Sequence, residues 1–332
     1  MSTSPRMEMP LTMERVQAAR RVLHGIVPVS RMVRADSLTP PQGAQILLKL
    51  ECEGPTGSFK VRGAYHALER RFKRGTVRGV VTASTGNHGA ATAFAARSLR
   101  LPARVYLPRN PNPAKRARIA ALGAEIIEAG AVLEESRKHA ARFARESGWY
   151  DLVDGVEPEM LPGAAAIACE ILEQAADARA LFVPVGDSTL IRGVAYAAKQ
   201  LQPEIRVVGV QAERAPAYAL AFEKGRAVAT ETSDTIADGL AVREASEENV
   251  REMKGLVDEF VLVSEEEMLA AVRRLLLEEH VVAEPAGAAT TAAFLKRGCA
   301  GGGTAVLLVT GANLSEDLLK RALGLPGGSE DR

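Results

Sequence analysis

Short apolar runs alternate with amphipathic stretches along most of this chain. The run at 304–309, TAVLLV, is continuously apolar except for its first residue, as expected of a strand buried on both faces. Stretches such as 88–98 and 133–146 have the length and spacing of helices that cover a sheet. This alternation favours an α/β fold with mostly parallel sheets.

The candidate elements are too many for one small sheet. A chain of 332 residues also exceeds the size, about 250–300 residues, at which single cores stop growing. We therefore expect two lobes, each a mostly parallel sheet flanked by helices, with 51–154 as the smaller lobe and 1–50 plus 155–332 as the larger. Strands are expected at 46–50, 79–82, 103–107, 125–128, 181–185, 207–211, 260–263 and 304–309. Helices are expected at 64–74, 88–98, 114–122, 133–146, 191–200, 265–279 and 286–296.

Charge and cysteine content exclude several classes of function. The 42 basic and 41 acidic side chains leave a net charge of +1, which gives no reason to expect a nucleic-acid or anionic-membrane partner. Cys52, Cys169 and Cys299 lie far apart, so they indicate neither a disulfide framework nor a zinc site. No run of 18 apolar residues and no signal peptide is apparent. We expect a cytoplasmic protein.

The first segment with chemical character is 55–65, PTGSFKVRGAY. Lys60 lies near the start of a predicted helix, beside the large apolar Phe59, and Ser58 is placed to cap that helix. A lysine that is partly removed from water has a lowered pKa, and its neutral amine can form a Schiff base with an aldehyde. An ordinary surface lysine is the alternative interpretation.

Two turns between a strand and a helix suit anions. The segment 82–89, TASTGNHG, gathers small hydroxyl side chains where backbone N–H groups are free, as a substrate carboxylate requires. The segment 184–193, PVGDSTLIRG, suits a phosphate at a helix N-terminus, provided that the Asp187 side chain turns away. Ordinary helix caps, by Ser84 or Thr85 and by Asp187 or Ser188, are the alternatives.

Three shorter segments complete the pattern: 235–239 (TIADG), 284–287 (EPAG) and 310–313 (TGAN). Thr310 follows an apolar strand, so its hydroxyl is expected at the carboxyl edge of a sheet, where ligands of open α/β sheets gather.

The SFKVRGA and STGNHG blocks, in this order, make the chain resemble the fold-type II pyridoxal-phosphate (PLP) enzymes. This family has a tryptophan-synthase-β-like fold and includes threonine and serine dehydratases, serine racemase and threonine synthase. The six segments that carry the resemblance span 51–313. The resemblance implies PLP as the cofactor, a small amino acid as the substrate and a homodimer as the assembly.

The resemblance also implies roles for individual residues. Lys60 would hold the cofactor as a Schiff base and move the Cα proton, Asn87 would hydrogen-bond the cofactor 3-hydroxyl, and Thr310 would hydrogen-bond the pyridine nitrogen. A hydroxyl at that nitrogen does not keep it protonated, which favours prompt loss of a β-substituent. The other implied positions are Phe59 and Gly239 near the ring, Ser84, Thr85, Gly86 and His88 at the substrate carboxylate, and Gly186, Asp187, Ser188, Thr189 and Leu190 at the cofactor phosphate.

The implied reaction is β-elimination from a hydroxy amino acid such as L-threonine or L-serine, which yields a 2-oxo acid and ammonia. An amino-acid racemase, a threonine synthase, a cysteine-synthase-like β-replacement enzyme and a non-catalytic α/β binding protein remain alternatives. The turn GDST stands where dehydratases carry a glycine run, and Thr85 stands where racemases carry a serine. The segment 209–218 lacks the acidic pair of metal-binding relatives, so no metal is expected. Since the chain ends soon after 313, we expect a catabolic or specialised dehydratase.

Overall fold

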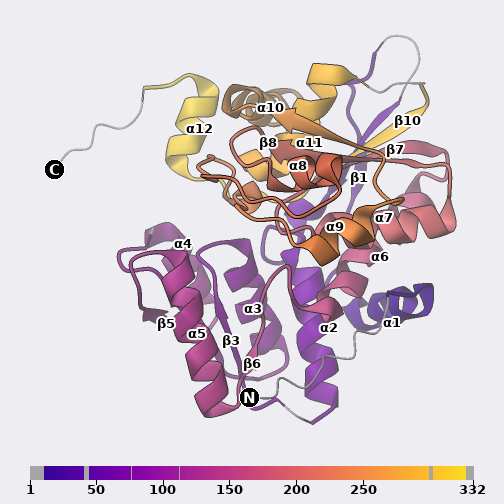
Figure 1. Ribbon diagram of the computed structural model, residues 1–332. Helices are drawn as coiled ribbons and strands as arrows, with labels where there is room; N and C mark the ends of the chain where they lie inside the picture. Colours follow the sequence, from indigo (N-terminus) through magenta and orange to yellow (C-terminus); the bar gives the residue numbers. More distant parts are fainter. Residues whose placement is uncertain (1–10, 41–44, 76, 112, 299–301, 327–332) are drawn as a thin grey trace.

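Two separate sheets form the framework of the molecule (Figure 1). The computed structural model describes residues 11–40, 45–75, 77–111, 113–298 and 302–326. All but one of the strand pairings are parallel, and helices flank both sheets. The α/β class and the two mostly parallel sheets expected from the sequence are confirmed. Across the described ranges, none of the helices has both the length and the apolar character needed to span a bilayer.

The larger sheet has six strands, and β10 lies next to its centre. Every residue of β10 is buried, which explains why this run is almost wholly apolar. Only the edge strand β1 is antiparallel to its neighbour. In spatial order the strands are β1 (Met32–Arg34), β2 (Ile46–Leu50), β10 (Thr304–Val309), β7 (Ala178–Pro184), β8 (Arg206–Ala212) and β9 (Glu259–Val263).

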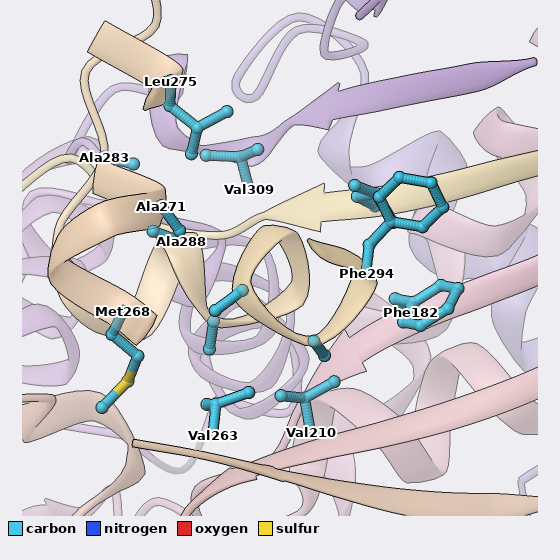
Figure 2. Packing of buried hydrophobic residues seen from close by; sticks show 14 of the residues in the cluster. Phe182, Val210, Val263, Met268, Ala271, Leu275, Ala283, Ala288, Phe294 and Val309 are labelled. Carbon is cyan, nitrogen blue, oxygen red and sulfur yellow. The ribbon is translucent and has the colours of Figure 1, made fainter. Parts of the chain in front are cut away.

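Hydrophobic cores fill both faces of this sheet. On one face α10 and α11 contribute, and Figure 2 shows Phe294 of α11 meeting Phe182 of β7 edge to face, with ring centroids 6.2 Å apart. On the other face α6 and α7 pack against the same strands. The helices are α1 (Met13–Leu23), α6 (Leu161–Gln174), α7 (Thr189–Leu201), α8 (Ala217–Lys224), α9 (Glu247–Met253), α10 (Glu265–Glu278), α11 (Pro285–Arg297) and α12 (Glu316–Leu323).

The smaller sheet has four parallel strands, and α2 links it to the rest of the molecule by packing against both α3 and α6. In spatial order its strands are β5 (Glu125–Glu128), β4 (Ala103–Leu107), β3 (Val80–Ala83) and β6 (Tyr150–Asp151). Its helices are α2 (Lys60–Lys73), α3 (Asn87–Ser98), α4 (Pro113–Ala121) and α5 (Leu133–Ser147). Short 3-10 turns occupy Glu51–Glu53, Pro158–Met160 and Asp238–Leu240.

A buried cluster of charges joins the two parts. Arg62 of α2 is 1% exposed and donates to Glu51 at 2.7 Å and to Glu170 of α6 at 2.6 Å. Lys49 of β2 donates to the same Glu170 at 2.8 Å. Buried charges are tolerated when each is paired and hydrogen-bonded, as these are. The cluster therefore fixes α2, and with it Lys60, relative to the larger sheet.

Candidate active site

A cavity of about 700 Å³ lies at the carboxyl ends of strands from both sheets. The residues that follow β3, β7 and β10 line it, as expected for ligand sites in open α/β sheets. All but one of the site residues expected from the sequence also line it. They are Phe59, Lys60, Ser84, Thr85, Gly86, Asn87, His88, Gly186, Asp187, Ser188, Leu190, Gly239 and Thr310. Thr189 is the exception, and its backbone N–H donates to Asp187 Oδ1 at 2.9 Å.

Lys60 is the first residue of α2, and two carboxylates hold its side chain. Its Nζ lies 2.5 Å from Asp154 Oδ2, 2.5 Å from Asp187 Oδ2 and 5.0 Å from the centre of the Phe59 ring. Burial disfavours the ammonium, but the two carboxylates outweigh it and raise the pKa of Lys60 above its ordinary value. The expectation of a lowered pKa is wrong, because the sequence did not reveal either carboxylate as a partner.

The two carboxylates differ in their surroundings. Asp187 Oδ1 accepts from the Thr189 N–H, and Asp154 Oδ1 accepts from the Gly155 N–H at 3.2 Å. Burial and the Asp187 carboxylate together raise the pKa of Asp154. Burial opposes ionisation of Asp187 as well, but the Lys60 ammonium lowers the pKa of Asp187 below its ordinary value. The 2.5 Å contact between its Oδ2 and Lys60 Nζ shows that the Asp187 side chain points toward the lysine.

Helix α2 begins without the cap that the sequence suggested. Its N-cap residue is Phe59, which makes no side-chain cap hydrogen bond. The buried Ser58 hydroxyl has no hydrogen-bond partner among the described residues, so the expected Ser58 cap is wrong. Instead, the Phe59 N–H donates to the Thr310 carbonyl at 3.1 Å, which ties the start of α2 to the end of β10. This contact brings the start of α2, and thus Lys60, to the same cavity wall as Thr310.

Residues 84–86 join β3 to α3, and together with the first two residues of α3 they form a segment 84–88 that lines the cavity. Ser84 Oγ accepts from the Gly86 N–H at 3.3 Å, so the hydroxyl shapes the turn. His88 Nε2 lies 2.9 Å from the Leu152 carbonyl, which can only accept, so Nε2 carries the proton in the neutral ring. Its Nδ1 is buried, has no hydrogen-bond partner in the described part of the chain and lies 3.7 Å from Asp154 Oδ2.

Asn87 belongs to a chain of side-chain hydrogen bonds. Its Nδ2 donates to Glu284 Oε1 at 2.7 Å, and its Oδ1 accepts from Asn313 Nδ2. Asn313 Oδ1 in turn accepts from Arg118 of α4. Burial raises the pKa of Glu284 above its ordinary value. These hydrogen bonds hold the Asn87 side chain at the cavity wall, where a bound ligand would contact it.

The turn 186–190 has the features of an anion site. Helix α7 begins at Thr189, so N–H groups of its first turn lack helical acceptors. Ser188 has a left-handed backbone with φ of 75°, and its buried hydroxyl has no partner within the described ranges. A Cβ at Gly186 would lie 2.1 Å from the Gly239 carbonyl, so only glycine fits there. A phosphate would satisfy these unpaired donors.

The sequence did not assign a role to several residues that line the cavity. Asp154 follows β6, a two-residue strand too short for a pattern to reveal. Had that strand been recognised, its carboxyl edge would have indicated Asp154. The remaining unassigned residues include Glu284, Asn313, Lys115, Arg118 and Arg137. Of these, Glu284 and Asn313 belong to segments that the sequence had marked.

Comparisons with known proteins find relatives over most of the chain. Residues 24–311 match the family model described as pyridoxal-phosphate dependent enzyme. The L-threonine ammonia-lyase of Thermotoga maritima is 35% identical over 256 residues, which cover 77% of this chain and 64% of that relative. The chain thus spans less than two thirds of that relative's length.

Solved structures share the fold over nearly the whole chain. Maize serine racemase superposes with a TM-score of 0.88 at 26% identity, covering 95% of this chain and 98% of that one. The processed form of threonine deaminase isoform 2 from Solanum lycopersicum gives a TM-score of 0.87 at 28% identity, covering 95% of this chain and 92% of that one.

Proposed function

The chain belongs to the family of pyridoxal-phosphate-dependent enzymes, of fold type II, and we propose that it catalyses β-elimination from a hydroxy amino acid such as L-threonine or L-serine. The products would be a 2-oxo acid and ammonia. The single observation that carries the proposal is the position of Lys60, which shares one cavity with the hydroxyl loop 84–88 and the anion turn 186–190. The similarity to L-threonine ammonia-lyase supports it.

Pyridoxal phosphate is the cofactor of this family, and the cavity fits it. The unpaired Ser188 hydroxyl and the first-turn N–H groups of α7, which lack helical acceptors, suit its phosphate once Thr189 N–H leaves Asp187, and the Lys60 amine suits its aldehyde. When bound, the cofactor supplies an electron sink for negative charge at Cα. We propose that the residues holding it are Phe59, Lys60, Asn87, Gly186, Asp187, Ser188, Thr189, Leu190, Gly239 and Thr310.

The substrate would be held by the loop that carries Ser84, Thr85, Gly86 and His88. N–H groups and hydroxyls at the start of α3 suit its carboxylate. Lys60 would remove the Cα proton. For this it must be a neutral amine, free of its contacts with Asp154 and Asp187, because an ammonium cannot accept a proton. The cavity walls would exclude bulk water from the reacting carbons.

The test is release of 2-oxo acid and ammonia from L-threonine, L-serine and 3-hydroxyaspartate by the PLP-loaded protein. We expect release from at least one of them, and a loss of at least about 100-fold in Lys60→Ala, since a positioned proton-transfer group contributes about 10²–10⁴-fold. The exposed Lys73→Ala is the matched control. A yellow protein that releases 2-oxo acid from none of the three would refute the elimination, and a colourless one would favour a binding protein.

Racemisation is the second candidate, because it needs a second proton-handling group and Thr85 lines the same cavity as Lys60. The methyl that threonine adds to the serine of racemases weighs against it, so elimination comes first. Chiral analysis of serine after incubation would detect this activity. Threonine synthesis and β-replacement would appear instead as formation of threonine or of a thioether.

Assembly, location and lobe boundaries are also proposals. We propose a cytoplasmic homodimer in which 51–154 form the substrate-loop lobe and 1–50 with 155–332 form the cofactor lobe. The placement of β3 to β6 within 80–151 supports that division. Mass photometry would test the dimer, and cell fractionation would test the location.

A further inference from the structure

We propose that Arg118 is a positioning residue that fixes the direction of hydrogen bonding through Asn313 and Asn87, so that Asn87 offers an N–H to the 3-oxygen of the cofactor. The inference deepens the proposed function and rests on the placement of the cofactor beside Asn87. Arg118 itself would touch neither the substrate nor the reacting atoms.

The contacts form one continuous chain across the cavity wall. Arg118 on α4 donates through Nη1 to Asn313 Oδ1, and Asn313 Nδ2 donates to Asn87 Oδ1. Asn87 Nδ2 then donates to Glu284 Oε1 at 2.7 Å. Four segments that are far apart in the sequence therefore meet in a single line of donors and acceptors.

Arginine decides the direction of this line because its guanidinium can only donate. An asparagine amide has nearly the same shape when its oxygen and nitrogen exchange places, so its neighbours must determine its orientation. Facing Arg118, Asn313 must present Oδ1, and its Nδ2 then faces Asn87. Asn87 must accept this hydrogen bond with its own Oδ1, so its two Nδ2 N–H groups remain for Glu284 and for a ligand in the cavity.

Glu284, at the opposite end of the line, imposes this direction only while it is ionised. Burial raises the pKa of Glu284, and a protonated carboxyl group can donate as well as accept. Without Arg118, the longer contact of Asn313 Nδ2 with the Thr56 carbonyl, at 3.2 Å, would be left to orient that amide. If both amides turned together, Asn87 would direct a carbonyl oxygen toward the cofactor. Arg118, by contrast, is a donor at every pH, because a guanidinium is not deprotonated in proteins.

Independent contacts hold Arg118 in place. Its Nη2 donates to the Thr56 carbonyl at 2.7 Å, and Asn313 Nδ2 lies 3.2 Å from the same oxygen. A Cβ at Gly57 would lie 2.6 Å from Asn313 Oδ1 and 2.7 Å from Arg118 Nη2, so the glycine leaves room for this pair. Among the described residues, the guanidinium donates to two neutral groups, the Asn313 amide and the Thr56 carbonyl.

A donor beside the 3-oxygen favours its ionised form, since hydrogen bonds to a charged form stabilise that form. The ionised and un-ionised forms of the bound cofactor absorb at different wavelengths, so the visible spectrum reports the state of the 3-oxygen. Arg118 should therefore change a spectral titration in addition to turnover.

The experiment is a pH titration of the visible spectrum of the PLP-loaded wild type, Arg118→Ala, Arg118→Gln and Arg118→Lys. A lysine ammonium also only donates, so Arg118→Lys should keep the wild-type midpoint. Alanine and glutamine at position 118 do not impose the orientation of the two amides. We expect the midpoints of the spectral titration to be higher in these variants than in the wild type by about one pH unit or more, equivalent to about 1.4 kcal/mol. Their kcat should fall about tenfold and KM should change less than about twofold, since one neutral-to-charged hydrogen bond is worth about 1.5–3 kcal/mol.

Arg116→Ala is the matched control, because Arg116 lies on the same helix and pairs with Glu128 on the surface. Identical titrations of wild type and Arg118→Ala would overturn the proposal. If Arg118→Ala does not fold, the glutamine and lysine variants decide, and equal midpoints for these two would overturn it. If the wild type binds PLP but eliminates nothing, only the proposed elimination is refuted. The Arg118 proposal can still be tested, because the spectral comparison does not need turnover.

Discussion

At the scale of single residues, the position of Lys60 between two carboxylates controls its reactivity. Its Nζ contacts Asp154 and Asp187 at 2.5 Å each, and these contacts favour the ammonium form. An aldehyde reacts with the neutral amine, so the carboxylates work against attachment of the cofactor. Asp187 also belongs to the turn proposed to bind a phosphate dianion.

We therefore expect Asp187→Asn to speed cofactor attachment at neutral pH. The pKa of Lys60 is raised, so the neutral amine is scarce and increases as the pH rises; weakening the ion pair lowers that pKa and shifts this increase to lower pH. Attachment should accelerate about tenfold for each unit by which the pKa falls. The growth of visible absorbance after PLP is added to the unloaded protein measures this rate, with the exposed Asp36→Asn as control. An unchanged or slower rate would show that the carboxylates do not restrain Lys60.

Residue identities at the site were more predictable than residue partners. Short motifs indicated Lys60, Asn87 and Thr310, and all three line one cavity. The contact between Lys60 and Asp154 joins residues 94 positions apart, and no local pattern marks Asp154. Partners of this kind depend on the packing of distant elements, which a single sequence does not specify.

At the scale of elements, α6 connects the two sheets through its contact with α2. It packs against α2, and its Glu170 receives hydrogen bonds from both Arg62 and Lys49. Both of these cations are almost fully buried. Removal of Glu170 would leave Lys49 without its carboxylate partner and Arg62 with only Glu51.

Glu170→Ala should lower the free energy of unfolding by about 3–5 kcal/mol, the usual cost of leaving a buried charge unpaired. Glu173→Ala, on the same helix, removes an exposed partner of Arg20 and should cost no more than about 1 kcal/mol. Denaturant unfolding of both variants measures the difference. Equal losses would mean that the buried cluster does not hold α2 and α6 together.

Helix α6 also shows where sequence patterns fail. Every residue from Leu161 to Ile171 is buried, so the helix has no polar face and no helical periodicity to detect. The strands were easier, because largely apolar runs such as 46–50 and 304–309 coincide with β2 and β10. The strands β1 and β6 were missed because three and two residues are too few to form a pattern.

At the scale of the whole molecule, the cavity exists because two sheets bring their carboxyl ends together. Residues after β3 come from the smaller sheet, and residues after β7 and β10 come from the larger one (Figure 1). The sequence predicted both sheets and the class of fold. The way in which the sheets face each other follows from the packing of α2 against α6, which no motif describes.

The central claim is that Lys60 holds the cofactor, and the most direct test is to fix the cofactor where it is attached. Borohydride reduction of the PLP-loaded protein, followed by peptide mass spectrometry, identifies the lysine that carries it. We expect the label on Lys60 and none in Lys60→Ala. Label on Lys115, the other lysine that lines the cavity, or on a surface lysine would contradict the account.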